Sequence, residues 1–327
     1  MRNAIILAAG KGTRMKSSQS KVMHRLIDRP MLAYIIDALR AVGVERIVVV
    51  VGYQAESIKA AFHDVEFALQ EPQLGTGHAV MQCTQLKDAQ GDTVIINGDG
   101  PCIQPETLER LFQTNKDASC TLLTAELEDA GAYGRIVRDA KGNVTSIVEA
   151  KDCTDQQKQI REINAGMYCF KNQDLFENLS KLQTNNAQNE YYLTDMVSIL
   201  ASQNKKVKGL VIENIDEVMG INDCYELNKA YVWMCNHINT HWMKEGVQIV
   251  DPLRTVIGKD VKIGKDVLIH PNVEILGQSV IGDGVELLPG TIVHDATIAS
   301  NIQIGPMSYV HECSCDQSIG SFIDYTK

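Results

Sequence analysis

Short apolar runs alternate with amphipathic stretches from residue 1 to about residue 220. Four of these runs, several of them apolar almost without interruption, predict β-strands over Ala4–Ala8, Arg46–Val51, Thr93–Ile96 and Cys120–Ala125. Strands of that kind are typical of a sheet that is buried on both faces, as in parallel α/β domains. Between them, helical spacing of apolar residues predicts helices over Pro30–Val42 and Pro105–Gln113. The alternation favours an open, doubly wound α/β sheet of the Rossmann-like type.

A single long helical pattern follows between Asp223 and Gly246. Its apolar stripe recurs at spacings of four, three, four and four residues, at Leu227, Tyr231, Met234, Ile238 and Trp242. Asp223 can cap the start of this helix, and Gly246 can end it. We expect residues 223–250 to form a connector helix between an α/β domain over residues 1–222 and a second domain.

After Asp251 the aliphatic residues recur every six positions. The series runs through Ile257, Ile263, Ile269, Ile275, Ile281, Leu287 and Val293, slips by one residue, and continues at Ile298, Ile304 and Val310. A hexapeptide repeat with glycine at several corners is the signature of a left-handed parallel β-helix, in which each hexapeptide forms one face of a three-sided coil. We therefore predict a short β-helix over residues 251–327 that acts as an assembly module.

Composition narrows the class of protein. The 327 residues include 41 acidic and 31 basic ones, for a net charge of −10, and an acidic chain lacks the general basic face that nucleic acids need. The apolar run at the N-terminus is too short for a secretion signal, and no stretch approaches the roughly 18 apolar residues of a membrane span. Nine scattered cysteines, an odd number, indicate reduced thiols. We expect a cytoplasmic protein that binds neither nucleic acid nor membrane.

A glycine-rich loop, Gly10-Lys11-Gly12, follows the first predicted strand. Such loops bind phosphate because the backbone can approach closely and successive N–H groups point at the anion. Neither GxxxxGK[ST] nor GxGxxG matches, and a bare G-x-G fits an ordinary strand-to-helix turn equally well. Four basic residues within eleven positions favour a triphosphate clamp over a solvated loop: Lys11, Arg14, Lys16 and Lys21.

The segment Leu7-Ala8-Ala9-Gly10-Lys11-Gly12-Thr13-Arg14-Met15, followed by Lys21-Val22, resembles the signature of sugar-1-phosphate nucleotidyltransferases. More narrowly, the chain resembles the bifunctional N-acetylglucosamine-1-phosphate uridyltransferase/glucosamine-1-phosphate acetyltransferase family. Four further segments match the uridyltransferase half of that family, at Gln70–Ala79, Asn97–Pro101, Tyr133–Arg135 and Asn185–Asp195. Their order and spacing agree over about 225 residues, and the hexapeptide segment follows where the family has its acetyltransferase domain.

The resemblance implies Mg²⁺-dependent transfer of UMP from UTP to N-acetylglucosamine-1-phosphate, which gives UDP-N-acetylglucosamine and pyrophosphate for peptidoglycan synthesis. Arg14 and Lys21 would be the catalytic cations that grip the phosphates. Asp99 and Asn222 would hold Mg²⁺. By the same resemblance, the substrates would contact Leu7, Ala8, Ala9 and Gly10 in the first loop, Gln70, Gln73, Gly75 and Thr76 at the uracil ring, and Gly134, Glu149, Asn164 and Asn222 around the sugar.

The chemistry of the residues agrees with these roles. Asp99 follows the strand Thr93–Ile96 at its carboxyl end, where open α/β sheets bind ligands, and a hard oxygen ligand suits Mg²⁺. Taken alone, an aspartate in Gly-Asp-Gly-Pro also fits a turn former, and Asn222 also fits the start of a helix. The attacking phosphate oxygen is already anionic, so catalysis would need positioning and charge neutralisation rather than a general base.

The chain departs from the family near the expected catalytic groups. The family usually has proline before the lysine that corresponds to Lys21, whereas this chain has Ser20. Its Gly-Asp-x-Pro-Leu segment reads Gly98-Asp99-Gly100-Pro101-Cys102 here, with an additional glycine beside the expected metal ligand. Both departures bear on how firmly the site is held, and so on the rate, more than on the type of reaction.

The β-helix departs further from the family. Acetyl transfer there uses a histidine and CoA-binding loops in later coils, which would lie beyond Lys327. It also has two arginines after a Gly-Pro step that reads Gly305-Pro306-Met307-Ser308 here. We therefore expect no acetyltransferase activity. The resemblance also implies a homotrimer assembled through the β-helix, with a monomer as the alternative because few coils are present.

Three alternatives stay open at this level. The enzyme could use another sugar-1-phosphate, such as glucose-1-phosphate, or another base. The chain could instead be a non-catalytic sugar-nucleotide binding protein, although a pure binder need not keep Arg14, Lys21, Asp99 and Asn222 together. Acetyl transfer could also persist through substitute residues. The choice of sugar depends on Glu149 and Asn164 and on the resemblance.

Overall fold

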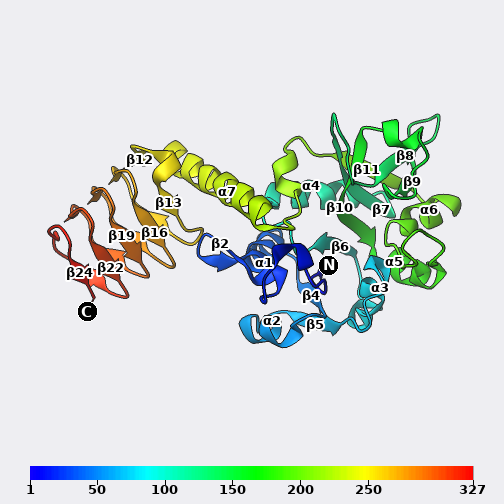
Figure 1. Cartoon of the computed structure of the whole chain (residues 1–327), viewed down its shortest axis with the longest axis horizontal. Helices are drawn as coiled ribbons and strands as arrows, with labels where there is room; N and C mark the ends of the chain where they lie inside the picture. Colours follow the sequence, from blue (N-terminus) through cyan, green and yellow to red (C-terminus); the bar gives the residue numbers. More distant parts are fainter. Residues whose placement is uncertain (327) are drawn as a thin grey trace. The chain divides into compact units, whose positions relative to one another are not determined.

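The structure, a computed structural model, describes residues 1–326 and divides into two compact units (Figure 1). Unit 1 comprises Met1–His24 and Pro30–Glu226. Unit 2 comprises Arg25–Arg29 and the chain from Leu227 onward. The chain therefore passes from one unit to the other at three points, and a five-residue piece near the N-terminus belongs with the C-terminal part.

Unit 1 is built on a mixed nine-stranded sheet whose main path has the order β11-β7-β10-β6-β1-β4-β5 (Figure 1). These strands are β1 (Arg2–Leu7), β4 (Arg46–Val51), β5 (Glu66–Leu69), β6 (Asp92–Asn97), β7 (Cys120–Glu126), β10 (Glu162–Lys171) and β11 (Val207–Val211). An antiparallel pair, β8 (Arg135–Arg138) and β9 (Val144–Val148), lies off this path, where β8 pairs with β10. The four strands predicted from apolar runs are confirmed as β1, β4, β6 and β7.

The sheet is mixed rather than wholly parallel because β10 runs antiparallel to both of its main neighbours, β6 and β7. Two parallel neighbours need a crossover connection, usually a helix. Between Glu126 and Glu162 the chain forms only the β8–β9 hairpin and the short 3-10 helix Gln157–Gln159. It therefore returns to the sheet in the opposite direction.

Both faces of the sheet are covered, which explains the uninterrupted apolar strands. The helices are α1 (Met31–Ala41), α2 (Ala55–Ala61), α3 (Thr76–Met81), α4 (Pro105–Asn115), α5 (Asn172–Asn178) and α6 (Asp195–Ser202). One buried cluster joins α1 and α4 to Ile6 and Ile96, and a second joins α5 and α6 to Ile5 and Ile95. Neighbouring residues of one strand thus serve opposite cores.

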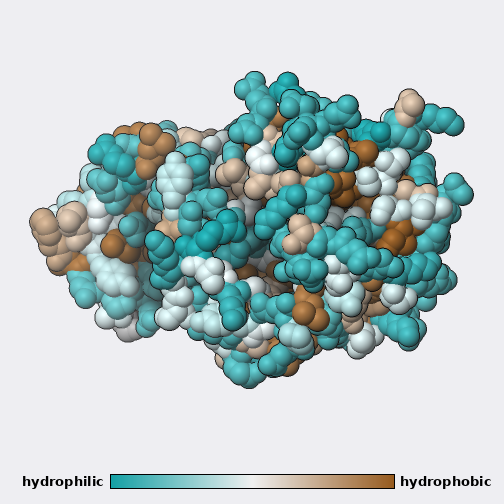
Figure 2. Space-filling view, turned by 45° about the vertical axis from the view of Figure 1, so that its right-hand side comes forward, coloured by the Kyte–Doolittle hydropathy of each residue, from teal (hydrophilic) through white to brown (hydrophobic). Residues whose placement is uncertain are grey.

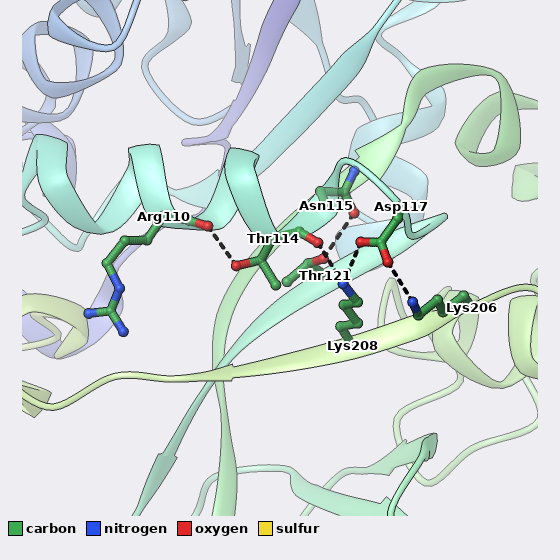
Figure 3. A network of polar contacts seen from close by, with 7 residues as sticks. All are labelled: Arg110, Thr114, Asn115, Asp117, Thr121, Lys206 and Lys208. Atoms are coloured by element: carbon green, nitrogen blue, oxygen red, sulfur yellow. Dashed lines mark hydrogen bonds and ion pairs between the residues drawn. The ribbon is translucent and has the colours of Figure 1, made fainter.

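A polar network ties the edge strand β11 to the turn between α4 and β7 (Figure 3). Asp117 accepts ion-paired contacts from Lys206 Nζ at 2.6 Å and Lys208 Nζ at 2.5 Å. Beneath it, Thr121 Oγ1 donates to Asn115 Oδ1 at 3.0 Å in a buried pair. The sequence pattern did not predict β11, because this strand is only half-buried.

The predicted connector helix is observed as α7 (Cys224–Lys244), which begins in unit 1 and continues into unit 2. None of the helices formed by residues 1–326 is long and apolar enough to cross a membrane. On the face that Figure 2 shows, apolar residues occur in small groups among hydrophilic ones.

Unit 2 contains a three-sided coil of short parallel strands, as the hexapeptide repeat predicts (Figure 1). The faces are β12-β15-β18-β21, β13-β16-β19-β22-β24 and β14-β17-β20-β23. Their bounds are Gln248–Ile249, Val256–Ile257, Lys262–Ile263, Leu268–Ile269, Glu274–Leu276, Val280–Ile281, Glu286–Leu287, Ile292–His294, Thr297–Ile298, Gln303–Ile304, Tyr309–His311, Ser314–Cys315 and Asp324–Tyr325 for β12 to β24 in order. All ten aliphatic positions of the repeat lie on these strands, and all but Ile263 are buried.

The N-terminal piece of unit 2 is the tip of a small hairpin, β2 (Arg25–Leu26) and β3 (Arg29–Pro30). Asp28 Oδ2 accepts a hydrogen bond from Gly277 N at 2.9 Å. A Cβ at Gly258 would lie 2.5 Å from the same oxygen, so only glycine leaves room for it. Arg29 Nη1 contacts both oxygens of Asp260, at 3.0 and 3.1 Å. A corner of the β-helix is thereby shaped to receive this hairpin.

Candidate active site

The glycine-rich loop leaves the carboxyl end of β1 and leads through two 3-10 turns, Thr13–Met15 and Lys21–Met23. Gly12 has a φ of 57°, a left-handed conformation that favours glycine. A Cβ at Gly12 would lie 2.7 Å from Lys21 Cβ. Glycine is therefore needed there both for the backbone turn and for the close approach of the Lys21 side chain.

The predicted catalytic and metal-binding residues form one cluster at the carboxyl ends of β1 and β6. Lys21 Nζ lies 2.5 Å from Asp99 Oδ2 and 3.2 Å from Asn222 Oδ1. Arg14 Nη2 donates to the same Asn222 oxygen at 2.8 Å. Asn222 reaches this position because Ile221 N donates to Asp99 O at 2.9 Å. The cationic side chains of Arg14 and Lys21 thus contact side-chain oxygens of Asp99 and Asn222, although these residues come from distant parts of the sequence.

Two cavities adjoin this cluster. The first, of about 340 Å³, has among its lining residues Ala8, Ala9, Gly10, Lys21, Gln70, Gln73 and Gly75. The second, of about 460 Å³, has among its lining residues Arg14, Gly134, Glu149, Asn164 and Asn222. Four residues line both cavities: Leu7, Thr76, Asn97 and Asp99. Every site residue predicted from sequence therefore lines at least one of the two, and Asp99 lies where they meet.

The first cavity is lined on one side by a loop that packs against the segment around Tyr191. Gln70 Nε2 donates to Gly75 O at 2.9 Å, and Gln73 Nε2 donates to Ala9 O. Gly75 has a φ of 104°, and a Cβ there would lie 2.6 Å from Tyr191 O. The amide groups of this loop are thus held in place by backbone contacts before any ligand enters.

The second cavity is lined by fixed polar groups of a different kind. Glu149 Oε1 accepts a hydrogen bond from Thr194 Oγ1 at 3.1 Å. Burial raises the pKa of Glu149, and the nearby Asp152 and Asp195 raise it further. Asn164 Nδ2 donates to the hydroxyl of Tyr168 at 2.6 Å, and this leaves its position well defined.

Comparison with known proteins agrees with the geometry. The profile of the MobA-like NTP transferase domain matches residues 4–190. The bifunctional protein GlmU of Limosilactobacillus reuteri is 43% identical over 350 residues, covering 100% of this chain and 77% of that protein. The bifunctional protein GlmU of Halalkalibacterium halodurans is 40% identical over 349 residues, with the same coverage, and that of Latilactobacillus sakei is 44% identical over 307 residues, covering 93% of this chain and 66% of that protein.

The chain belongs to the GlmU family. It is a sugar-phosphate nucleotidyltransferase, and its substrates are a nucleotide and a sugar phosphate. The family resemblance inferred from five short motifs is thereby confirmed over the whole chain.

Two residues of this site received no role from the sequence. Tyr133 lines the second cavity, and burial raises its pKa, with Glu226 and Asp99 adding to the rise. Glu226 lines the same cavity from the first turn of α7. The Asp223-x-x-Glu226 spacing is a capping-box signal that could have drawn attention to Glu226.

Buried Arg135 holds the loop that carries Tyr133 and Gly134. Its Nη1 and Nη2 donate to the backbone oxygens of Tyr133 and Gly131, the second at 3.1 Å. The Arg135 residue is 5% exposed. It therefore replaces solvent as the hydrogen-bond partner of this loop.

The donor set suits magnesium. Asp99 and Asn222 present oxygen atoms to the same ammonium group, so they converge on one small volume. Within residues 1–326 no group of three or more histidine, cysteine, aspartate or glutamate side chains could hold a metal ion. Mg²⁺ needs no such group, because it binds through one or two protein oxygens together with substrate phosphates.

The two departures from the family pattern leave the cluster intact. Ser20 adopts φ −56° and ψ 136°, a conformation open to proline. A Cβ at Gly100 would come no closer than 3.5 Å to Met167 Cε, so packing does not require glycine there. The additional glycine beside Asp99 therefore increases the flexibility of the backbone there, and it is not required by close packing.

Proposed function

We propose that this enzyme transfers UMP from UTP to N-acetylglucosamine-1-phosphate, with Mg²⁺, and releases pyrophosphate. The observation that supports this most strongly is the position of Asp99 at the junction of the two cavities. A nucleotide beside Gln70 and Thr76 and a sugar phosphate beside Glu149 and Asn164 would both extend their phosphates to that junction. The product, UDP-N-acetylglucosamine, would serve peptidoglycan synthesis, in the cytoplasm where UTP is available.

The proposed reaction is an in-line displacement at the α-phosphorus of UTP. The 1-phosphate oxygen of the sugar attacks, the bond to the β-phosphate oxygen breaks, and pyrophosphate leaves with that electron pair. Arg14 and Lys21 would neutralise the charge that builds up on the phosphates, and the two cavities would align the reactants. Mg²⁺ held by Asp99 and Asn222 would supply further charge neutralisation.

The choice of sugar is assigned to the second cavity. Glu149 and Asn164 offer a carboxylate and an amide beside Gly134 in the lining of this cavity. These groups suit the hydroxyl and N-acetyl groups of N-acetylglucosamine. Glucose-1-phosphate is the second candidate, since it would use the same phosphate contacts.

The β-helix is assigned a role in assembly, as a homotrimer, without acetyl transfer. The Gly305-Pro306-Met307-Ser308 step lacks the arginines that the family's acetyltransferase domain has there. Incubation with acetyl-CoA and glucosamine-1-phosphate should release no free thiol, and sedimentation should give three times the mass of the chain. Thiol release above the rate without enzyme would contradict the first assignment.

The test of the transferase is pyrophosphate release by the full chain with UTP, Mg²⁺ and N-acetylglucosamine-1-phosphate. Each component is omitted in turn, and glucose-1-phosphate replaces the sugar in a parallel reaction. Asp99→Ala should abolish turnover, whereas Asp88→Ala, at an exposed position away from both cavities, should keep it. Binding of UDP-N-acetylglucosamine without turnover of any sugar phosphate would contradict the proposal in favour of a binding protein.

A further inference from the structure

The start of α7 carries a reciprocal cap that differs from the usual one. Asp223 Oδ1 accepts a hydrogen bond from Glu226 N at 2.8 Å, as an N-cap residue does. In a capping box the glutamate reaches back to the N–H of the cap residue itself. Here Glu226 Oε2 accepts from the N–H of Asn222, one residue earlier, at 2.6 Å.

Asn222 is thereby held at its backbone as well as at its side chain. Its Nδ2 donates to Gly220 O at 3.3 Å, and its Oδ1 accepts from Arg14 and Lys21. The Glu226 contact adds a short hydrogen bond between a carboxylate and a backbone N–H, which is among the stronger kinds. The direction in which Asn222 Oδ1 points thus depends on a carboxylate four residues further along the chain.

Glu226 also lies at the site rather than remote from it. It lines the second cavity together with Tyr133 and Asp99. Its first-turn position on α7 gives it a second favourable contact, because helix N-termini attract negative charge. The carboxylate is therefore fixed between the helix and the residue it holds.

We propose that Glu226 is a positioning residue that aims Asn222 Oδ1 at the divalent cation of the bound nucleotide. The inference rests on the proposed function, in which Asn222 and Asp99 hold that cation. Glu226 acts through Asn222, in the way that outer-shell partners orient metal ligands. It need not touch the cation or either substrate.

The competing explanation is that Glu226 only stabilises the start of α7. Three full-length variants separate the two. Glu226→Ala removes the contact with Asn222, Glu226→Gln keeps an acceptor but removes the charge, and Asp223→Ala weakens the same helix start while leaving Glu226 in place. The melting temperature of each variant, compared with that of the natural protein, measures how much stability is lost when the start of α7 is weakened.

The deciding measurement is the affinity of Mn²⁺ for the enzyme–UTP complex, from the electron paramagnetic resonance signal of free Mn²⁺. UTP without an acceptor sugar gives no turnover, so this readout is independent of catalysis. Glu226→Ala should weaken Mn²⁺ binding about tenfold, the lower end of the usual effect of an outer-shell partner. Glu226→Gln and Asp223→Ala should bind Mn²⁺ nearly as well as the natural protein.

Equal Mn²⁺ affinity in Glu226→Ala and Asp223→Ala would overturn the proposal, and so would a Glu226→Gln variant as weak as Glu226→Ala. Pyrophosphate release by the natural protein is measured alongside. If turnover is present and Mn²⁺ affinity is unmoved, positioning fails while the function stands. If Mn²⁺ affinity falls as expected and no sugar phosphate is turned over, the function fails while positioning stands.

Discussion

Lys21 Nζ lies 2.5 Å from Asp99 Oδ2, so a predicted catalytic cation and a predicted metal ligand are paired with each other. Both side chains are largely buried, with 16% and 19% of their surface exposed. A divalent cation and a phosphate that enter between the cavities would compete for these two groups. Lys21 balances the charge of Asp99 in this structure, and in the proposed reaction it would exchange that partner for a phosphate of the nucleotide.

Replacing Lys21 by methionine should lower turnover by about 10²–10³-fold, because the lysine would stabilise charge that develops only during transfer. Asp99 would also lose its ion-pair partner. Steady-state pyrophosphate release measures the effect, with Lys59→Met on α2, at an ion pair outside both cavities, as the control. Turnover of Lys21→Met close to that of the control would contradict the assignment.

Gly12→Ala should reduce both stability and turnover, because a Cβ there would collide with the Lys21 side chain. Gly142→Ala is the matched variant, since Gly142 also has a positive φ, of 83°, but nothing within 4 Å of the added atom. Each substitution should cost roughly 1 kcal/mol in backbone strain. Only Gly12→Ala should raise the KM for UTP, and an equal effect of the two variants on KM would count against the role of Gly12.

Glu149→Gln should stabilise the protein at neutral pH while weakening sugar-phosphate binding. Burial raises the pKa of Glu149 in the folded state, so the ionised carboxylate opposes folding. That penalty grows as the pH rises from the ordinary pKa towards the raised one, is complete above it, and disappears in acid. The gain in Tm over the natural protein should therefore be present at pH 8 and shrink towards pH 4. The exposed Glu128→Gln should show no such trend, and a constant gain at all pH values would refute the explanation.

Ser20→Pro should stabilise the protein by about 0.4–1 kcal/mol, since the native φ already suits proline and the unfolded chain loses freedom. The change also removes the buried Ser20 Oγ, which has no hydrogen-bond partner within residues 1–326. Urea unfolding measures the gain. A lower urea midpoint for the variant would show that the hydroxyl or the amide N–H of Ser20 has a use in the fold.

Sequence pattern predicted those elements whose period or burial is uniform. β1, β4 and β6 are strands covered on both faces, so their apolar runs are easily recognised, and the β-helix repeats one aliphatic position ten times, nine of them buried. The antiparallel direction of β10 could not be read, because side-chain alternation is the same in either direction. β11 lies at the sheet edge and is half-exposed, so its apolar signal is weak.

The part of the site that lies within short sequence motifs was predictable. Arg14, Lys21 and Asp99 lie within segments that resemble a known signature, and the structure brings them together. Their roles stay predictions until the variants are measured. Glu226 was missed because its significance comes from one hydrogen bond to Asn222, whereas the Asp223-x-x-Glu226 spacing marks only a helix start. The docking of Asp28 on Gly277 was equally out of reach, since the two are 249 residues apart.

The hairpin tip at Arg25–Arg29 limits how such a protein can be recombined in evolution. A β-helix taken from another chain would need a glycine where Gly258 leaves room for Asp28 and a carboxylate where Asp260 meets Arg29. Conversely, a transferase half moved onto a foreign partner would bring along a hairpin with no matching corner. The two halves are therefore expected to be inherited as a set. Exchange between lineages should succeed only when the hairpin and the matching corner of the β-helix are transferred together.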